Sequence, residues 1–268
     1  MINVCYCVNS GVFNGLLLSI LSMLNRTKER VNVIVLTMDL TFLNPNFLPL
    51  STSQTNLLKR VISQKNGGSL TVFDVTTLYK THFLGGKNEG TGYTPYSMIR
   101  LFLDLLPVPE KIAYLDADVM FTGDIKTLFD QDISTVEFGA CKDFMGKFWI
   151  DKNYCNSGVM LLNLAKIKAS KLFEKCRKVV ASKKMFMPDQ TALNRLATSK
   201  KILPNKFNEQ RNVKKDTVIK HFCKGIKWLP FFKIYNVKQW QRDKVKTFLK
   251  INCFDGDFAE FDKIIGAK

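Results

Sequence analysis

The stretch KIAYLDAD, residues 111–118, decides the fold more than any other part of the chain. Residues 111–115, with an apolar run at 112–115, are predicted to form a buried strand. The strand leads directly into Asp116-Ala117-Asp118, and residues two apart on an extended chain face the same side. Because ligands of open α/β sheets bind at the carboxyl ends of the strands, both carboxylates are expected in a site there. Two adjacent carboxylates repel each other, and a hard divalent cation relieves the repulsion. A loop with two solvated aspartates is the alternative.

The segments on either side of this stretch predict a doubly wound α/β sheet. Residues 4–8 form a short apolar run, residues 16–24 place apolar side chains at helical spacing, and residues 31–36 are rich in β-branched side chains. This strand–loop–helix–strand order is typical of the start of such a sheet. Further strands are expected at 70–75, 138–142 and 159–163, the last after a polar turn at Asn156-Ser157-Gly158, and helices at 55–63, 96–106, 171–182 and 191–197.

The composition excludes several classes of protein. A hydrophobic content of 46% excludes a disordered chain, and 268 residues can bury a large core without disulfide staples. The seven cysteines include no C-x-x-C pair, which argues against a zinc ribbon or a thioredoxin-type motif, and scattered thiols suit a reducing cytosol. The apolar stretch at 15–24 is too short to cross a bilayer, and the N-terminus begins as a strand rather than as a signal peptide. We therefore expect a cytoplasmic protein, with peripheral attachment to the inner face of a membrane left open.

The net charge of +17 is unevenly distributed along the chain. Residues 201–250 carry 14 Lys and Arg against 3 Asp and Glu. Such a surface attracts an anion, which could be nucleic acid, anionic lipid or a phosphorylated substrate. Clustered lysines with interleaved aromatics are also typical of nucleic-acid-binding proteins. The aromatic residues in this segment are Phe207, Phe222, Trp228, Phe231, Phe232, Tyr235 and Trp240.

Six short motifs in a fixed order resemble those of the family 8 glycosyltransferases. They are YSMIRL at 96–101, IAYLDAD at 112–118, GACKD at 139–143, YCNSGVMLLNL at 154–164, PDQTAL at 188–193 and HFCKGIKW at 221–228. Each motif alone is weak, but together they cover about residues 1–230 with family-like spacing. The family consists of retaining enzymes that use nucleotide sugars, and it includes bacterial lipopolysaccharide galactosyl- and glucosyltransferases and glycogenin. The resemblance implies an α/β fold: a single Rossmann-like, nucleotide-sugar-binding domain of the GT-A type, with a mixed, mostly parallel central sheet and a small basic C-terminal region.

The resemblance also implies a metal site. In the family, both aspartates of the D-x-D motif and a histidine near the C-terminus bind Mn²⁺, and these match Asp116, Asp118 and His221. A donor set of carboxylates and imidazole suits Mn²⁺ better than Mg²⁺, which remains the alternative. The chain has two histidines, and the other, His82, is expected to be structural or exposed.

Further matches imply how a UDP-sugar would be held. Val8 and Asn9 correspond to the uridine site, and Ala117, Gly225 and Lys227 to contacts of the nucleotide and its phosphates. The residues expected around the sugar and the reacting centre are Arg100, Asp143, Asn156, Asp189 and Gln190. Gln190 corresponds to the position beside the anomeric carbon, and because an amide is a poor nucleophile we expect front-face attack by the acceptor hydroxyl.

The sequence departs from the family pattern in three places, the last of which involves two residues. Asn9 stands where an aspartate is usual, although an amide can pair with a pyrimidine edge. Thr191 replaces a common third acid after Asp189-Gln190. In the phosphate-binding turn, Gly225 is shifted by one position, and Trp228 follows Lys227 without the usual proline.

These observations predict a retaining, Mn²⁺-dependent hexosyltransferase. The expected donor is UDP-galactose or UDP-glucose, and the expected acceptor is a glycan or glycolipid of cell-surface glycan biosynthesis. Residues 1–230 would form the catalytic domain, and residues 231–268 a basic, aromatic extension that contacts the acceptor or an anionic membrane surface. Nucleic acid is not expected as a partner. A basic nucleic-acid-binding protein and a metal-dependent nucleotidyltransferase, which would release pyrophosphate rather than UDP, are the alternatives.

Overall fold

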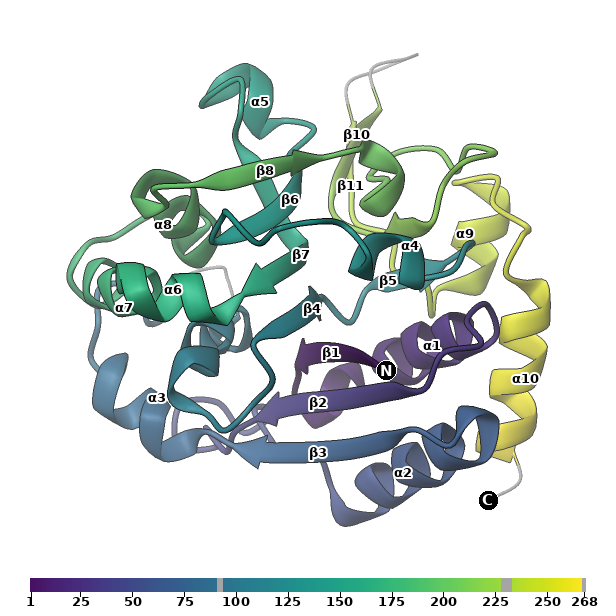
Figure 1. The fold of residues 1–268 in the computed structure, drawn as a ribbon. Coiled ribbons are helices and arrows are strands. Elements are labelled where there is room, and N and C mark those ends of the chain that lie inside the picture. The colour runs from purple at the N-terminus through teal and green to yellow at the C-terminus, as the bar shows by residue number, and fades with distance from the viewer. Residues whose placement is uncertain (91–93, 228–232, 267–268) are drawn as a thin grey trace.

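A seven-stranded sheet in the order β3-β2-β1-β4-β7-β6-β8 forms the centre of the molecule (Figure 1). The computed structural model describes residues 1–90, 94–227 and 233–266. Within the sheet only β7 runs against its neighbours, so the sheet is mixed and mostly parallel, as predicted. The strands are β1 (Ile2–Cys7), β2 (Val31–Thr37), β3 (Ser69–Asp74), β4 (Lys111–Leu115), β6 (Phe138–Lys142), β7 (Cys155–Asn163) and β8 (Lys200–Leu203).

Two hydrophobic cores lie on opposite faces of this sheet, because successive strand residues point to opposite sides. In β1, Val4 and Tyr6 belong to one core, and Cys5 and Cys7 belong to the other. The first core is covered by α1 (Phe13–Leu24), α2 (Thr52–Asn66) and α10 (Asp255–Gly266). The second is covered by α3 (Thr76–His82), the 3-10 helix η2 (Pro95–Leu105), α6 (Leu164–Ser170), α7 (Leu172–Ser182) and α8 (Pro188–Leu196).

Two short strand pairs lie outside the central sheet. The strand β5 (Val119–Phe121) pairs antiparallel with β9 (Ile219–His221), and β10 (Gly225–Lys227) pairs antiparallel with β11 (Lys233–Tyr235). The first pair brings residues 219–221 to the residues that follow β4. The remaining short helices are η1 (Ser10–Val12), α4 (Lys126–Phe129), α5 (Gly146–Trp149), η3 (Asn205–Phe207) and α9 (Arg242–Thr247).

The C-terminal residues share the core of the N-terminal half. Val245, Phe254 and Phe258 are buried in the same core as the apolar side of α1. Both oxygens of the buried Asp257 accept hydrogen bonds of 2.8 Å from the guanidinium of Arg26, which follows α1. Figure 1 shows α10, in yellow, beside α1. The boundary predicted at residue 230 lies outside the described residues.

One of the predicted elements is wrong in type. Asn156-Ser157-Gly158 is not a turn but the start of β7, because neighbouring side chains satisfy the polar groups of Asn156 and Ser157. The helix predicted over 96–106 is confirmed, and it is the 3-10 helix η2. A three-residue period places its side chains in rows, and Tyr96, Ile99 and Phe102 are all buried in the core beside the sheet.

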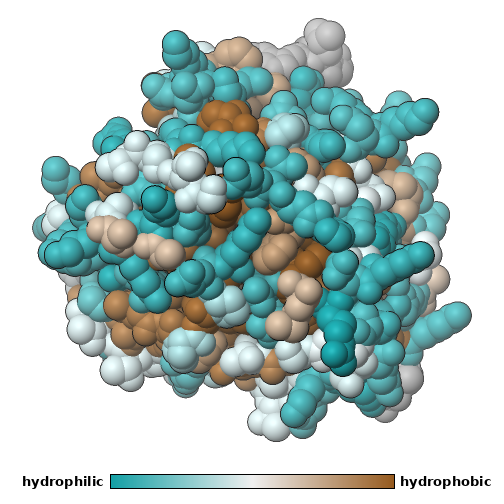
Figure 2. Space-filling view, in the orientation of Figure 1, coloured by the Kyte–Doolittle hydropathy of each residue, from teal (hydrophilic) through white to brown (hydrophobic). Residues whose placement is uncertain are grey.

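One face of the molecule is mostly polar (Figure 2). On the face shown in Figure 2, hydrophilic residues cover most of the molecule, and apolar ones lie scattered between them. Among the described residues, no helix combines the length and the apolar character that a bilayer crossing needs.

Candidate active site

The candidate site lies where the strand order of the sheet reverses. Strands β1 and β4 are parallel neighbours, whereas β2 and β3 extend the sheet to one side and β7 to the other. Ligands of open α/β sheets bind at the carboxyl ends of the strands beside such a point. Asp116 follows β4 directly, and its backbone N–H donates a 2.7 Å hydrogen bond to the carbonyl oxygen of Gly158 in β7. Strands β4 and β7 thus hold Asp116 at the carboxyl end of β4.

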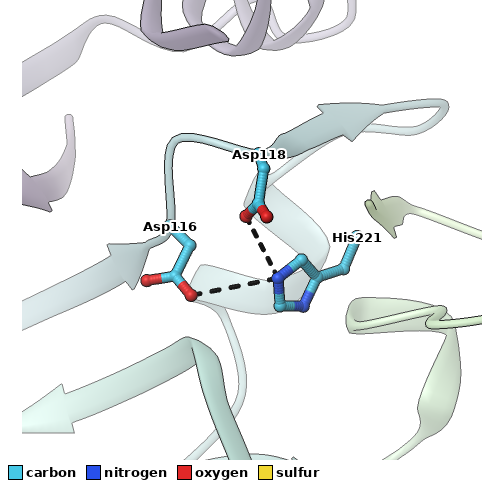
Figure 3. A group of neighbouring side chains, drawn as sticks. All are labelled: Asp116, Asp118 and His221. Atoms are coloured by element: carbon cyan, nitrogen blue, oxygen red, sulfur yellow. Dashed lines mark ion pairs between the residues drawn. The ribbon is translucent and has the colours of Figure 1, made fainter. Parts of the chain in front are cut away.

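Three potential metal ligands converge at this edge. One ligand atom from each of Asp116, Asp118 and His221 lies within 4.8 Å of the other two. Figure 3 shows the Nε2 atom of His221 between the carboxylates, 3.1 Å from Asp118 Oδ1 and 3.9 Å from Asp116 Oδ2. The antiparallel pairing of β5 with β9 places His221 opposite Val119, and so beside the D-x-D turn.

The donor set fits a divalent cation. Asp118 Oδ1 is buried and accepts no hydrogen bond from the described residues, so it is an unsatisfied anion aimed at the group. Nδ1 of His221 lies 3.0 Å from Asn208 Oδ1, a bond in which the imidazole donates. The remaining nitrogen, Nε2, faces the two carboxylates, so it can pair with them as a charged ring or give its lone pair to a bound cation. Carboxylates with an imidazole oriented in this way are a common arrangement around divalent ions.

A positively charged side chain binds the second carboxylate oxygen of each aspartate. Asp116 Oδ1 accepts a 3.1 Å hydrogen bond from Arg100 Nη2 and a 2.8 Å bond from the Tyr114 hydroxyl. Asp118 Oδ2 accepts a 2.5 Å bond from Lys238 Nζ. Burial by itself raises the pKa of Asp118, but His221 and Lys238 outweigh burial and hold that pKa far below its usual range. Asp118 is therefore ionised at neutral pH.

Arg100 connects the potential metal ligands to the start of α8. Its guanidinium donates to the carbonyl oxygen of Ser157 and lies 4.0 Å from the ring centre of Tyr114. Its Nε atom lies 3.2 Å from Asp189 Oδ2, in an ion pair. Burial raises the pKa of Asp189, and the positive charge of Arg100 opposes that rise.

A hydrogen-bonded chain of buried polar side chains continues from His221 across the site. Asn208 Nδ2 donates to Asn156 Oδ1 at 2.9 Å, and Asn156 Nδ2 donates to Asp143 Oδ2 at 2.9 Å. Gln190 Nε2 reaches the same Asp143 oxygen at 3.4 Å, and its Oε1 accepts from the backbone N–H of Ser157 at 2.9 Å. Each of these side chains is held in one orientation by its neighbours.

These groups open onto one cavity of about 850 Å³. That volume is within the range of pockets that bind cofactors or other small molecules. The predicted site residues in its wall are Arg100, Asp116, Asp118, Asp143, Asn156, Asp189, Gln190, His221 and Gly225.

Three predicted residues, Val8, Asn9 and Ala117, are not part of this cavity wall, and the side chain of a fourth lies outside what the structure describes. Val8 and Asn9 follow β1, and Val8 is completely buried, with its N–H bonded to the carbonyl of Leu36 at 3.0 Å. The Asn9 side chain accepts a hydrogen bond from the N–H of Val12 and so begins η1. The carbonyl oxygen of Ala117 accepts a 2.6 Å bond from Gln239. Lys227 ends β10, and its side chain lies outside what the structure describes.

The sequence prediction missed two residues of the site, Asn208 and Lys238. Both belong to the basic C-terminal half, where neither stands at a recognisable spacing from the D-x-D motif. Lys238 is one of 14 basic residues in a segment of 50, so nothing in the sequence distinguishes it from the other basic residues. Only the folded chain shows their contacts with His221 and Asp118.

Comparisons with known proteins show which family the chain resembles in sequence. Residues 3–244 match the family described as Glycosyl transferase family 8. A Haemophilus influenzae protein is 28% identical over 187 residues, which cover 58% of this chain and 51% of that one. Glycosyltransferase GlyF of Streptococcus pneumoniae is 28% identical over 103 residues, which cover 37% of this chain and 25% of that one. The chain thus matches about half, or less, of the length of these relatives.

Solved structures share the fold at low sequence identity. The galactosyltransferase LgtC, in complex with donor and acceptor sugar analogues, superposes with a TM-score of 0.65 at 19% identity, covering 99% of this chain and 96% of that chain. The bifunctional glycosyltransferase WbbM gives a TM-score of 0.69 at 16% identity, covering 97% of this chain and 49% of that chain. The chain has the GT-A fold of these enzymes, and it belongs to glycosyl transferase family 8.

Proposed function

We propose that the protein transfers a hexose, galactose or glucose, from a UDP-sugar to a glycan or glycolipid, with retention of configuration and with Mn²⁺ as cofactor. The observation that carries the proposal is the convergence of Asp116, Asp118 and His221 at the wall of a large cavity in a family 8 chain. The unsatisfied Asp118 Oδ1 supports a cation at this place. Mg²⁺ is the alternative ion. The comparisons favour neither a nucleic-acid-binding protein nor a nucleotidyltransferase.

The residues of the cavity divide into two groups by the part of the donor that they would bind. Asp116, Asp118 and His221 would hold the metal, which when bound supplies a positive charge for the diphosphate leaving group. The Asp143–Asn156–Gln190 chain, with Asp189, offers carboxylates and amides in a buried setting, which is the chemistry that recognises sugar hydroxyls. Val8, Asn9 and Ala117 would contact the uridine, and Gly225 and Lys227 the phosphates.

The contacts of Gln190 support front-face attack rather than a covalent intermediate on this residue. Its amide oxygen already accepts hydrogen bonds from both the N–H and the hydroxyl of Ser157, and an amide is a poor nucleophile. In the proposed step, the acceptor oxygen bonds to the anomeric carbon as the bond from that carbon to the phosphate oxygen breaks. The acceptor proton passes to the leaving phosphate, so that UDP is released. A sugar adduct trapped on Asp189 or on any other side chain would overturn this step.

Exposed aromatic residues at the cavity mouth support a carbohydrate acceptor. Trp149 at the end of α5 is 75% exposed, and Phe186 just before α8 is 70% exposed, and both line the cavity. Large aromatic faces beside polar groups offer one apolar side and one wet side, which suits a sugar ring. The acceptor would therefore approach between α5 and the start of α8.

A donor screen tests the proposed reaction directly. Purified protein is incubated with individual UDP-sugars and with Mn²⁺, Mg²⁺ or EDTA, and released UDP is measured. We expect UDP release from UDP-galactose or UDP-glucose with Mn²⁺ and little release with EDTA. Release of pyrophosphate, or turnover that EDTA leaves unchanged, would contradict the proposal.

Attachment to an anionic membrane surface is the final part of the proposal. The net charge of +17 attracts anionic lipid, and Trp240, in the basic segment, is 38% exposed. The other aromatic residues predicted to take part, Trp228, Phe231 and Phe232, lie outside the described residues. We expect the protein to sediment with phosphatidylglycerol vesicles at low salt and not with phosphatidylcholine vesicles. Failure to bind the anionic vesicles would contradict a membrane role.

A further inference from the structure

Lys238 places a positive charge against a proposed metal ligand. Its Nζ atom lies 2.5 Å from Asp118 Oδ2 and donates a second hydrogen bond, of 3.0 Å, to the carbonyl oxygen of Phe222. Asp118 uses its other oxygen, Oδ1, to face His221. The lysine therefore leaves the metal-facing oxygen free while it holds the carboxylate from behind. The same residue also lines the cavity, together with Asn236.

The chain around Lys238 fixes this lysine in place. The next residue, Gln239, is completely buried and donates to the carbonyl oxygens of Gly15 in α1 and Ala117 in the D-x-D turn. The backbone N–H of Lys238 donates to Gln241 Oε1 at 3.0 Å, and the N–H of Gln241 returns a 2.9 Å bond to the carbonyl of Lys238. This segment is thus tied to the same turn that carries Asp116 and Asp118.

Arg100 and Lys238 have parallel positions in the site. Arg100 binds Asp116 Oδ1 and leaves Oδ2 towards His221, and Lys238 binds Asp118 Oδ2 and leaves Oδ1 towards His221. They differ in exposure, because the Arg100 side chain is 3% exposed and that of Lys238 is 23% exposed. Lys238 therefore keeps access to an anion in the cavity.

We propose that Lys238, held in position by Asp118, binds the diphosphate. Its positive charge opposes binding of the metal alone and favours binding of the nucleoside diphosphate beside the metal. The physical reason is the sign of its charge. An ammonium close to the ligand carboxylates repels a divalent cation and attracts a phosphate, and both effects are strong where water is excluded. The inference rests on the proposed nucleotide-sugar function.

The test measures two affinities in four proteins. Dissociation constants for Mn²⁺ alone, and for UDP at saturating Mn²⁺, are measured by calorimetry for the wild type and for Lys238→Met, Lys238→Arg and Lys244→Met. Lys244 lies in α9 of the same basic segment and is exposed, so its variant removes one positive charge away from the site. Methionine keeps the length and the apolar stem of the lysine.

Lys238→Met should shift the two affinities in opposite directions. We expect Mn²⁺ alone to bind about tenfold more tightly, and UDP beside Mn²⁺ to bind about tenfold more weakly. Lys238→Arg should keep UDP binding near the wild-type value, and Lys244→Met should change neither constant. A merely structural role would weaken both affinities together, and that result, or no change in either, would overturn the proposal for Lys238. Failure of the wild type itself to bind UDP with Mn²⁺ would overturn the proposed function, and the proposal for Lys238 with it.

Discussion

Asn208 sets the orientation of His221 through a single buried hydrogen bond of 3.0 Å. A partner of this kind fixes which nitrogen of a ligand histidine is free, and its loss typically costs 10–100-fold in metal affinity. We therefore expect Asn208→Ala to weaken Mn²⁺ binding about tenfold or more. Calorimetry of Mn²⁺ binding measures the effect. Asn153→Ala, which changes an exposed asparagine, is the control and should bind Mn²⁺ as the wild type does. Unchanged affinity in Asn208→Ala would show that the bond does not orient His221.

At the residue scale, the site residues that belong to motifs could be predicted from the sequence. The residues that hold those side chains in position could not. Asp116 and Asp118 follow an apolar strand, and His221 stands before Gly225 and Lys227 in a motif that resembles the family's, so each has a signal. Asn208 and Lys238 have no such signal. Lys238 contacts Asp118, more than 100 positions away in the chain, and Asn208 acts through a side-chain hydrogen bond to His221 within the C-terminal half. Val8 and Asn9 stay predictions, since neither lines the cavity wall.

The close packing of strand β7 against the site can be tested by substituting Gly158. A Cβ atom added at Gly158 would lie 2.2 Å from His221 Cε1 and 2.8 Å from Asp116 Oδ2. Because real Cβ atoms do not approach other atoms so closely, Gly158→Ala should displace both side chains and reduce Mn²⁺ affinity at least about tenfold, an effect of the size seen when ligand positioning is lost.

The matched control is a glycine on the adjacent strand. At Gly139 in β6, an added Cβ would meet the side chains of Leu203 and Ile133 at 3.2–3.3 Å, away from the metal ligands. Gly139→Ala should therefore keep Mn²⁺ binding. Circular dichroism checks that both variants remain folded. Wild-type Mn²⁺ affinity in Gly158→Ala would contradict the close packing of β7 against the site.

At the element scale, periodicity and apolar runs predicted strands and helices well, and failed where polar groups are satisfied inside the protein. Residues 111–115 and 138–142 were predicted with the bounds that β4 and β6 have. The start of β7 was wrong because Asn156-Ser157-Gly158 reads locally as a turn. In the folded chain the same polar side chains bond Asp143 and Gln190, and a polar segment becomes part of a central strand.

The buried thiols predict how the stability of the whole molecule depends on pH. Burial raises the pKa of Cys176 from 9.0 to about 12, and that of Cys155 to about 11. Between pH 9 and those values the unfolded chain loses thiol protons that the folded chain keeps. The stabilisation is therefore complete below pH 9 and is lost as pH rises, by up to about 1.4 kcal/mol per pH unit for each such thiol.

Urea unfolding under reducing conditions at pH 8, 9 and 10 measures this loss. We expect the fall in the free energy of unfolding between pH 9 and pH 10 to be about 1 kcal/mol smaller in Cys176→Ala than in the wild type. Cys253→Ala, which removes an exposed thiol, should leave most of the fall in place. An identical fall in Cys176→Ala and the wild type would show that Cys176 does not keep its proton on folding.

At the scale of the whole molecule, the charge of +17 indicated an anionic partner without saying which. The fold favours an anionic partner that binds beside the D-x-D turn, because β9 and the segment around Lys238 bring two parts of the basic C-terminal half to that turn. The packing of α10 against α1 could not be foreseen, since it joins the two ends of the chain.

The central claim is that Asp116, Asp118 and His221 bind a metal that in turn holds UDP. Calorimetry of UDP binding, with Mn²⁺ and with EDTA, tests it most directly in the wild type, in Asp118→Asn and in Asp130→Asn. The last variant changes a surface aspartate whose ion-pair partner, among the described residues, is Lys126, and it serves as the control. We predict that EDTA, or Asp118→Asn, weakens UDP binding by about a hundredfold or more, and that Asp130→Asn leaves it unchanged. Equal UDP affinity with Mn²⁺ and with EDTA, or full affinity in Asp118→Asn, would contradict the account.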